Sequence, residues 1–352
     1  MRSRQPLHIA LVAPAGDDAP PPRAVRALAP ALRAHGIDVT LLPAPTTAAD
    51  TRRAQAGHIW PRARTLRLAL RRDGARLALS FTVPDHLALS LATLGRPTRA
   101  ILWQAALPAW STTAASRWFW RLLPLLVKRA DTALAAPNAP LVETLARRAG
   151  VPAGMVARLP LPLPDDAESL PQAPPDLLSR PPVILFPAPL ERAMQPGMAV
   201  RAFGLLEDES ARLVLPATGT SERAIRHMVE HLGLRRRVTF VPPREIGGWF
   251  DKARLCCLPP RIDPFGLYAL RALAHGLPVV GTRIPALVDI IGHDPALGTL
   301  VETTDTEGLG HALARRLRHP GEAAPRLRRA RDFSPARIAE EWKERISHIA
   351  ND

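Results

Sequence analysis

The chain contains few cysteines, few lysines and no long apolar run. Its 352 residues include two cysteines, which are adjacent at Cys256 and Cys257. Neighbouring side chains of a strand point to opposite faces and bridge poorly, so a disulfide-stapled scaffold is excluded. We expect two core thiols in a reducing compartment. Because no run of about 18 apolar residues occurs, we also expect no transmembrane helix.

The composition is otherwise that of a globular protein. Hydrophobic residues make up 47% of the chain and charged residues 22%, which excludes a disordered chain. At roughly 100–200 residues per domain, the length predicts two domains. The basic start, Met1–Arg4, and the apolar run Leu7–Ala13 faintly resemble a signal peptide, but the run is short and contains His8. We therefore interpret it as a first β-strand and expect a cytoplasmic protein.

Arginine supplies 44 of the 47 cationic side chains, and the formal net charge is +15. Proline, at 39 residues, is about twice as frequent as usual. A GC-rich genome, whose codons favour arginine, alanine and proline, explains both features. The alternative is an anionic partner: nucleic acid, an acidic membrane face or a phosphorylated ligand. Nucleic-acid binding has no support besides the charge, because the arginines are spread along the chain without a recognition motif.

Apolar runs alternate with amphipathic stretches of helical period along most of the chain. This alternation predicts parallel sheets covered by helices on both faces. A proline-rich stretch, residues 161–182, interrupts it and is typical of an interdomain linker. We predict an α/β protein of two Rossmann-like domains facing a cleft, residues 1–160 and 183–333, with a final helix in 334–352. Ligands of such sheets bind at the carboxyl ends of the strands, and the cleft is the expected site.

The expected elements follow from these patterns. Short apolar runs predict strands over 7–13, 38–42, 76–81, 99–103 and 132–136 in the first domain and over 183–186, 212–215, 237–241, 254–258, 278–281 and 299–301 in the second. Helical periods and helix-ending residues predict helices over 23–35, 84–94, 116–129, 139–149, 306–318 and 335–349, and further helices are expected between the strands of the second domain.

The most informative segment is residues 258–281, where an expected strand, a tight loop, a helix and a second strand follow one another. The loop carries an acid, Asp263, and Gly266, whose missing Cβ lets the backbone approach a ligand closely. The amides of Phe265, Gly266 and Leu267 are expected to lie free at the helix N-terminus, which is a ready anion site. With Asp263 positioned for sugar hydroxyls, this loop predicts a nucleotide-sugar cradle. The alternative is a generic strand–turn–helix in which Asp263 only caps the helix.

This segment resembles the donor-site signature of glycosyltransferase family 4, whose members are retaining enzymes of the GT-B fold. The similarity rests on Asp263-Pro-Phe-Gly-Leu267 and on Leu270-Arg-Ala-Leu-Ala-His-Gly-Leu-Pro-Val-Val280. Weaker similarity covers most of the chain. The resemblance implies a hexosyltransferase-type enzyme of polysaccharide biosynthesis that moves a sugar from a nucleotide-sugar donor to a hydroxyl of a glycan or lipid-linked acceptor, without a metal or cofactor. It also implies that Asp263 contacts the donor sugar and that residues 334–352 cross back to the first domain.

Three departures from the family pattern fall within the expected site. The second acid of the signature, which accepts hydrogen bonds from ribose, is Arg271 here, and a guanidinium has no acceptor. Arg271 is expected instead to meet a phosphate or to pair with a surface acid. The clamp sequences Gly-Arg and Lys-Gly are replaced by Ala188-Pro189 and Met194-Gln195, which leaves Arg192 as the candidate to restore one charge. Gln104 stands where the family has a histidine, and it can bond a sugar hydroxyl but cannot act as an acid or base.

Two further loops carry candidate ligand contacts. Gly219 and Thr220 follow the second strand of the second domain and are donor-side candidates, with a plain turn as the alternative. Gly16 and Asp17 follow the first strand, where the family meets its acceptor, with a helix-entry role for Asp17 as the alternative. The scattered histidines show no metal-ligand spacing. His275 is expected to be a helix-end cation.

Residues 116–129 combine aromatic and aliphatic side chains with cations. Trp118 and Trp120 lie next to Arg117 and Arg121, a composition that suits an interfacial helix on anionic lipid. The alternative is a core helix of the first domain with a basic outer face. Peripheral attachment to the inner face of a membrane is therefore kept beside a freely cytoplasmic location.

These observations favour a retaining glycosyltransferase whose partners are a nucleotide-sugar donor and a glycan or lipid-linked acceptor. The alternative is a protein of the GT-B fold that is catalytically impaired and serves as a binding or partner subunit. The motivation for this alternative is the loss of both clamp cations and of the second acid of the signature.

Overall fold

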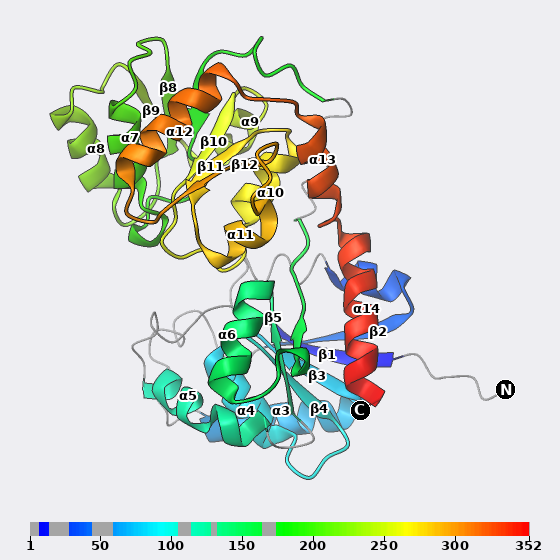
Figure 1. The fold of residues 1–352 in the computed structure, drawn as a ribbon. Coiled ribbons are helices and arrows are strands. Elements are labelled where there is room, and N and C mark those ends of the chain that lie inside the picture. The colour runs from blue at the N-terminus through cyan, green and yellow to red at the C-terminus, as the bar shows by residue number, and fades with distance from the viewer. Residues whose placement is uncertain are drawn as a thin grey trace. The chain divides into compact units, whose positions relative to one another are not determined.

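The computed structural model of the chain describes residues 7–13, 28–43, 59–104, 114–127, 132–163 and 174–351 (Figure 1). The chain divides into two compact units. The first unit comprises Met1–Asp165 together with Ser334–Asp352, and the second comprises Asp166–Phe333. The stretch expected to link two domains, residues 161–182, lies partly outside the described residues.

The first unit contains a six-stranded sheet in which all strands are parallel. The strand order is β2-β1-β3-β4-β5-β6, and Ile9 pairs with Val39 on one side and with Leu77 on the other. The central strands are apolar and buried, as expected where both faces of a parallel sheet are covered. The bounds are β1 Leu7–Ala13, β2 Ile37–Pro43, β3 Leu77–Ser80, β4 Arg99–Trp103, β5 Thr132–Ala136 and β6 Val156–Arg158.

Helices α3 to α6 cover one face of this sheet. Their buried leucines and alanines form a single core with alternate strand residues such as Val12, Ala78 and Leu102. Asn138 caps α6 by accepting the backbone N–H of Leu141 at 3.1 Å, and Gly150 ends this helix in the left-handed conformation. The bounds are α3 Ile59–Asp73, α4 Val83–Ala92, α5 Ala114–Val127 and α6 Ala139–Ala149, and residues 28–34 are also helical.

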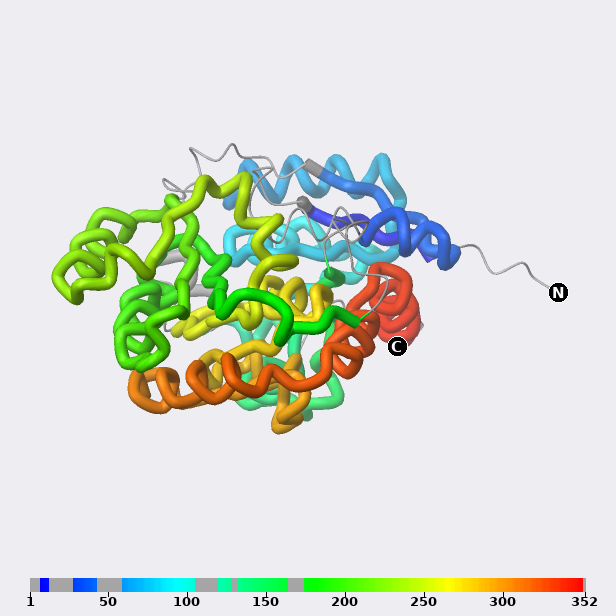
Figure 2. Tube along the Cα trace, turned by 90° about the horizontal axis from the view of Figure 1, so that it is seen from above, coloured from blue at the N-terminus to red at the C-terminus, as the bar shows by residue number. Residues whose placement is uncertain are grey.

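The C-terminal helix α14, Pro335–Asn351, belongs to the first unit (Figures 1 and 2). The indole Nε1 of its buried Trp342 donates to the carbonyl oxygen of Pro160 at 2.8 Å. Glu341 forms an ion pair with Arg158, at 2.8 Å between oxygen and nitrogen. These two contacts attach the last helix of the chain to residues at and just after β6.

The second unit also contains six parallel strands, in the order β12-β11-β10-β7-β8-β9. Strand β10 carries Cys256 and Cys257, which are buried and free, and burial raises the pKa of each thiol. The prediction of two core thiols is confirmed. The strands are β7 Val183–Leu185, β8 Arg212–Pro216, β9 Val238–Val241, β10 Leu255–Leu258, β11 Val279–Thr282 and β12 Gly298–Val301. The α-helices are α7 Pro196–Gly204, α8 Glu222–His231, α9 Ile246–Trp249, α10 Leu267–Ala274, α11 Pro285–Ile291, α12 Thr306–Arg318 and α13 Ala324–Arg331.

The two parallel sheets with their helices confirm the predicted α/β fold class. Every predicted strand is present, with bounds that agree to within one residue at each end. The sequence patterns missed β6, α3 and α13. None of the helices in the described residues combines the length and the apolar character needed to span a membrane.

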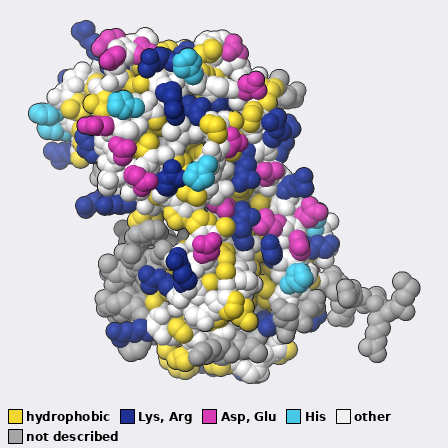
Figure 3. All heavy atoms as spheres, in the orientation of Figure 1, with side chains coloured by type: hydrophobic (Ala, Val, Ile, Leu, Met, Phe, Trp, Pro, Cys, Tyr) yellow, Lys and Arg dark blue, Asp and Glu magenta, His cyan; other side chains and the backbone are white. Residues whose placement is uncertain are grey.

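Arginines of the second unit donate extensively to backbone carbonyls. Arg326 is fully buried, and its guanidinium donates to the carbonyl oxygens of Ala296 at 2.8 Å, of Gly276 at 2.9 Å and of Pro320. Burial, assisted by the neighbouring charge of Arg316, lowers the pKa of Arg326 to about 9. On the face of the molecule in view, arginine and lysine side chains are interspersed with aspartate and glutamate (Figure 3).

Candidate functional site

The predicted donor-side residues lie in three loops that follow the carboxyl ends of parallel strands in the second unit. Residues 188–195 follow β7, residues 217–221 follow β8, and residues 259–266 follow β10. Ligands of parallel α/β sheets bind at this edge. Hydrogen bonds between the loops show that the edge is one connected structure, as described below.

Asp263 organises the loop between β10 and α10. Its Oδ1 accepts the backbone N–H of Phe265 at 3.1 Å and that of Gly266 at 2.9 Å. Gly266 has φ 66°, and a Cβ at this position would overlap Ile290 of α11, so that only glycine fits. The carboxyl group is half-buried; burial raises its pKa, and the two N–H donors oppose that rise.

The prediction that three amides lie free at the start of α10 is wrong for two of them. The N–H groups of Phe265 and Gly266 turn back to Asp263, because the carboxylate sits two to three residues ahead of them in a tight turn. Leu267 is the first residue of α10 and is half-buried. The observed arrangement is close to the alternative in which Asp263 satisfies its own turn, so an anionic ligand has to compete with this carboxylate.

Arg271 of α10 lies against an aromatic side chain. Its guanidinium carbon is 5.0 Å from the centroid of the Phe250 ring, within cation–π range. His275 stacks on the same Phe250 ring, with 5.2 Å between the ring centroids. The Nδ1 atom of His275 lies 2.8 Å from Oδ1 of Asp251. The His275 ring, predicted as a helix-end cation, is buried; burial lowers its pKa, and the bond to Asp251 opposes this shift. Tyr268 of α10 was not among the predicted site residues. Burial and the charge of Asp263 raise its pKa.

Gly219 and Thr220 lock the loop after β8 onto the loop after β7. Glu191 accepts the backbone N–H of Thr220 at 2.9 Å and also its hydroxyl, and these bonds lower the pKa of Glu191. Gly219 has φ 121°, and a Cβ there would lie 2.5–2.7 Å from backbone atoms of Leu190. The pair is therefore more than a plain turn, since the close approach of two backbones requires glycine. Sequence reasoning missed Glu191.

Gln195 joins the loop after β7 to two other loops. It adopts φ 50° and ψ 50°, and it is the one non-glycine residue with positive φ among those described. Its Nε2 donates to the carbonyl oxygens of Pro259 at 3.0 Å and Thr303 at 3.1 Å. The position is the one where the family pattern has glycine, which adopts this conformation without strain. Arg192, an exposed residue of the short helix Arg192–Met194, lies in the same loop.

The loops after β7 and β10 also meet directly. The backbone N–H groups of Arg261 and Ile262 both donate to the carbonyl oxygen of Ala193, at 2.7 and 3.2 Å. These bonds bring the Arg192 loop and the Asp263 loop together. The cation that sequence analysis proposed for the phosphates and the acid that it proposed for the sugar thus lie in adjoining segments of one edge.

In the first unit, Gln104 belongs to a buried hydrogen-bonded chain. Its Oε1 is 3.0 Å from Nε2 of His86, whose Nδ1 is 2.7 Å from the hydroxyl of Ser80. Because an amide oxygen only accepts, Nε2 donates to Gln104 and Nδ1 accepts from Ser80. Burial lowers the pKa of His86 to about 3, so the ring stays neutral. The acceptor-side candidates Gly16 and Asp17 lie outside the described residues.

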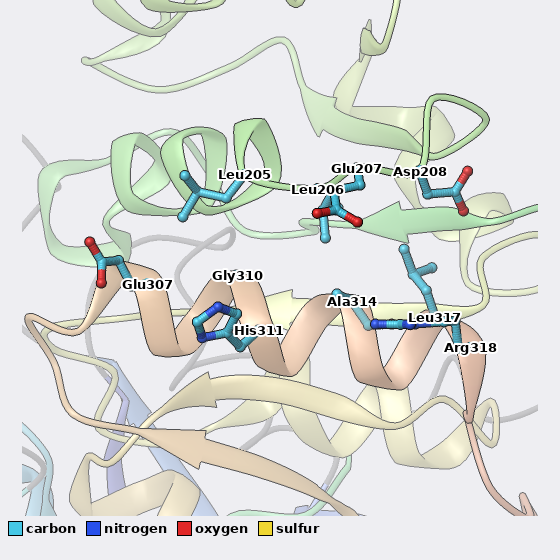
Figure 4. Close-up of a pocket in the computed structure, with 10 residues that line it drawn as sticks. All are labelled: Leu205, Leu206, Glu207, Asp208, Glu307, Gly310, His311, Ala314, Leu317 and Arg318. Atoms are coloured by element: carbon cyan, nitrogen blue, oxygen red, sulfur yellow. The ribbon is translucent and has the colours of Figure 1, made fainter.

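A hollow of about 670 Å³ elsewhere on the second unit contains none of the predicted site residues. It lies between residues 205–208 and one side of α12 (Figure 4). Glu207 and Asp208 stand on one wall, with His311 and Arg318 on the other. The hollow thus shares no lining residue with the three loops of the candidate site.

A known protein family matches most of the second unit. Residues 181–319 match the family model described as glycosyl transferases group 1. Over these residues the second unit is similar to the glycosyl transferases group 1 family. The resemblance of the donor-site signature to this class is confirmed, since the matched range holds all three loops of the candidate site.

A curated protein that this part of the chain resembles is a D-inositol 3-phosphate glycosyltransferase of Mycolicibacterium paratuberculosis. It is 30% identical over 154 residues, which cover 42% of this chain and 35% of the relative. A second, from Paenarthrobacter aurescens, has the same description and is 34% identical over 128 residues, covering 34% and 31%. The chain spans about a third of the length of the curated relatives that it matches.

Solved structures resemble the whole chain in fold. A glycosyltransferase from Rickettsia africae has a TM-score of 0.79 at 14% identity, covering 99% of this chain and 100% of that one. Anabaena Alr3699/HepE in complex with UDP-glucose has a TM-score of 0.73 at 14% identity, covering 97% and 100%. The predicted GT-B fold is confirmed.

Proposed function

We propose that the chain is a retaining glycosyltransferase that moves a sugar from a nucleotide-sugar donor to a hydroxyl of a glycan or lipid-linked acceptor. The observation that carries the proposal is the Asp263–Leu267 loop, which follows β10 inside the matched glycosyltransferase domain. Two findings on other proteins support it: relatives are described as D-inositol 3-phosphate glycosyltransferases, and the Anabaena neighbour holds UDP-glucose. In this proposal the second unit binds the donor and the first unit binds the acceptor.

Each of the three loops of the candidate site has a role in the proposed binding of the donor. Asp263 exchanges its bonds to Phe265 and Gly266 for a hydroxyl of the donor sugar, and the released amides, with that of Leu267, face the diphosphate. Arg192 supplies positive charge to the leaving diphosphate, which is where charge develops in the transition state. Thr220, with Gly219, shapes the floor of the same edge. The acceptor attacks the face of the sugar from which the diphosphate leaves, which retains the anomeric configuration, and the family resemblance implies that no metal or cofactor takes part.

The acceptor side rests on Gln104 and on the first loop of the chain. The bond to His86 fixes the orientation of the Gln104 amide, whose oxygen accepts from the ring. We assign this amide, with Gly16 and Asp17, to the hydroxyl groups of the acceptor. Helix α5 exposes Leu122 (37%) and Leu125 (62%), which supports peripheral contact with an anionic membrane surface that presents a lipid-linked acceptor.

Thermal unfolding with UDP, GDP, ADP and their sugars is the first test. A ligand at 100 times its dissociation constant stabilises by about 2.7 kcal/mol, and we expect one nucleotide to produce that shift. Asp263→Ala is expected to abolish sugar transfer with that donor. No shift with any nucleotide, or full transfer by the variant, would contradict the assignment of the site.

A second function has a specific observation in its favour. Arg271, which replaces the second acid of the signature, lies against Phe250. The position therefore carries no acceptor for a ribose hydroxyl, which favours a catalytically impaired protein that serves as a binding or partner subunit. A nucleotide-dependent shift without transfer to any glycan or lipid-linked acceptor is the outcome expected of this alternative.

A further inference from the structure

A cationic hollow lies at the edge of the sheet in the second unit. It has a volume of about 200 Å³ and is formed along β12, the last strand of its sheet. Three arginines and one histidine line it: Arg283, Arg315, Arg316 and His293. No acidic side chain is among the described residues of its lining, and none of these residues belongs to the candidate donor site.

Two of the three guanidinium groups donate to one hydroxyl in the lining of the hollow, that of Thr299. Nη2 of Arg315 and Nε of Arg316 donate to Oγ1 of Thr299, at 3.3 and 3.2 Å. Because this oxygen accepts two bonds from cations, its own O–H proton points elsewhere and serves as a donor. The guanidinium groups and the Thr299 hydroxyl thus present hydrogen-bond donors to the hollow, and such donors recognise an oxyanion.

Two of the arginines have structural partners that hold them in place. Nη2 of Arg316 donates to the carbonyl oxygens of Pro295 and Gly298, at 2.5 and 3.0 Å. Arg283 reaches the carbonyl of Leu300 at 3.5 Å and forms an ion pair at 3.2 Å with Glu302, an exposed acid. The two carbonyls fix the Arg316 side chain before any ligand arrives, which lowers the entropy that binding loses, whereas an anion at Arg283 has to compete with Glu302.

The arginines repel one another, and an anion relieves that repulsion. Burial and the adjacent charge of Arg315 both lower the pKa of Arg316. The guanidinium of Arg315 is exposed and keeps donors beyond its bond to Thr299. A tetrahedral oxyanion between Arg315, Arg283 and the Thr299 hydroxyl therefore meets preorganised donors and reduced charge repulsion.

We propose that the hollow along β12 binds a phosphate group. The ligand class is a phosphomonoester, carried either by a small soluble molecule or by a lipid headgroup at a membrane surface. The proposal does not depend on the donor site, because the two sets of residues do not overlap.

Calorimetric titration with inorganic phosphate at constant ionic strength tests the proposal. We expect wild-type protein to bind at millimolar phosphate and Arg315→Gln to bind at least tenfold more weakly. Arg235→Gln is the matched control: it removes the same charge from a side chain that is 76% exposed and lies outside the hollow, and we expect less than a twofold change. Both substitutions are at exposed positions, so the fold is expected to tolerate them.

Three outcomes overturn the proposal: no binding by the wild type, equal weakening in both variants, or full binding by Arg315→Gln, which would place the phosphate at another site. Vesicle flotation then identifies the source of the phosphate group. Binding to phosphatidylcholine vesicles that contain phosphatidic acid, lost in Arg315→Gln, assigns a lipid headgroup. Binding of inorganic phosphate without such vesicle binding assigns a soluble ligand.

Discussion

His86 is expected to make the stability of the first unit depend on pH. Its ring is fully buried between Ser80 and Gln104, and burial, opposed only by the bond to Gln104, lowers its pKa to about 3. In the unfolded chain the pKa of the ring is about 6.5. Between these two values the unfolded chain binds a proton that the folded chain does not, so the free energy of unfolding falls as the pH falls.

The size of the loss in the free energy of unfolding follows from the difference between the pH and the pKa of the ring in the unfolded chain. At pH 5, about 1.5 units below it, the loss relative to pH 8 is about 2 kcal/mol, at about 1.4 kcal/mol per unit. His86→Asn keeps an amide in the cavity but has no titrating group. We expect the variant to be less stable than the wild type at pH 8 and to lose about 2 kcal/mol less between pH 8 and pH 5.

Urea denaturation of both proteins at a series of pH values measures the difference. Asp85, whose pKa burial raises, is common to both proteins and cancels in the comparison. His319→Asn, at an exposed position, controls for the exchange itself. The reasoning is refuted if the wild type and His86→Asn lose stability in parallel, or if the His86 ring, followed by nitrogen NMR, titrates near pH 6.5.

Two further substitutions test contacts that hold the second unit together. Gly219→Ala is expected to cost at least about 2 kcal/mol, because the new Cβ meets backbone atoms of Leu190 at 2.5–2.7 Å, whereas Gly248→Ala, which meets nothing within 4 Å, is the neutral control. Chemical denaturation measures both, and equal stabilities would contradict the packing described. Arg326→Lys is expected to cost about 2–4 kcal/mol because an ammonium cannot serve the same set of carbonyls. A change below about 0.5 kcal/mol, as expected of the exposed control Arg235→Lys, would show that those bonds contribute nothing.

Among the described elements, every strand except the short β6 was predictable from the sequence, whereas helices α3 and α13 were not. Buried parallel strands are continuous apolar runs, so composition alone locates them. Helices α3 and α13 bury an arginine each, Arg62 and Arg326. A pattern that assigns every arginine to the solvent side weakens the period of 3.6 in such helices. Helix α12 also buries an arginine, Arg316, but its leucines at 309, 313 and 317 keep the period, and it was predicted.

The features of the candidate site likewise fall into those that a local sequence pattern predicts and those that it does not. Asp263 was identified because it acts within its own loop, where turn chemistry is local. The contacts that require glycine at 219 and 266 are with Leu190 and Ile290 of other segments, and no local pattern predicts them. The bonds of Gln195 to Pro259 and Thr303 join segments that lie 64 and 108 positions apart, and no local pattern predicts them. The capture of two amides by Asp263 is local, and the spacing of an acid two to three residues before the amides was the signal for it.

The abundance of arginine and the scarcity of lysine have a structural consequence that bears on the charge of +15. Arg254 donates to the carbonyl oxygens of Arg180 and Leu317, and Arg326 to four others, geometries that need a planar group with several donors. A lysine ammonium is a point donor on a flexible stem and cannot replace them. Much of the positive charge of the second unit is thus directed inward to its own backbone. A nucleic-acid partner is not needed to account for it, and exposed cations such as Arg192 and Arg315 are the ones left to meet an anionic ligand.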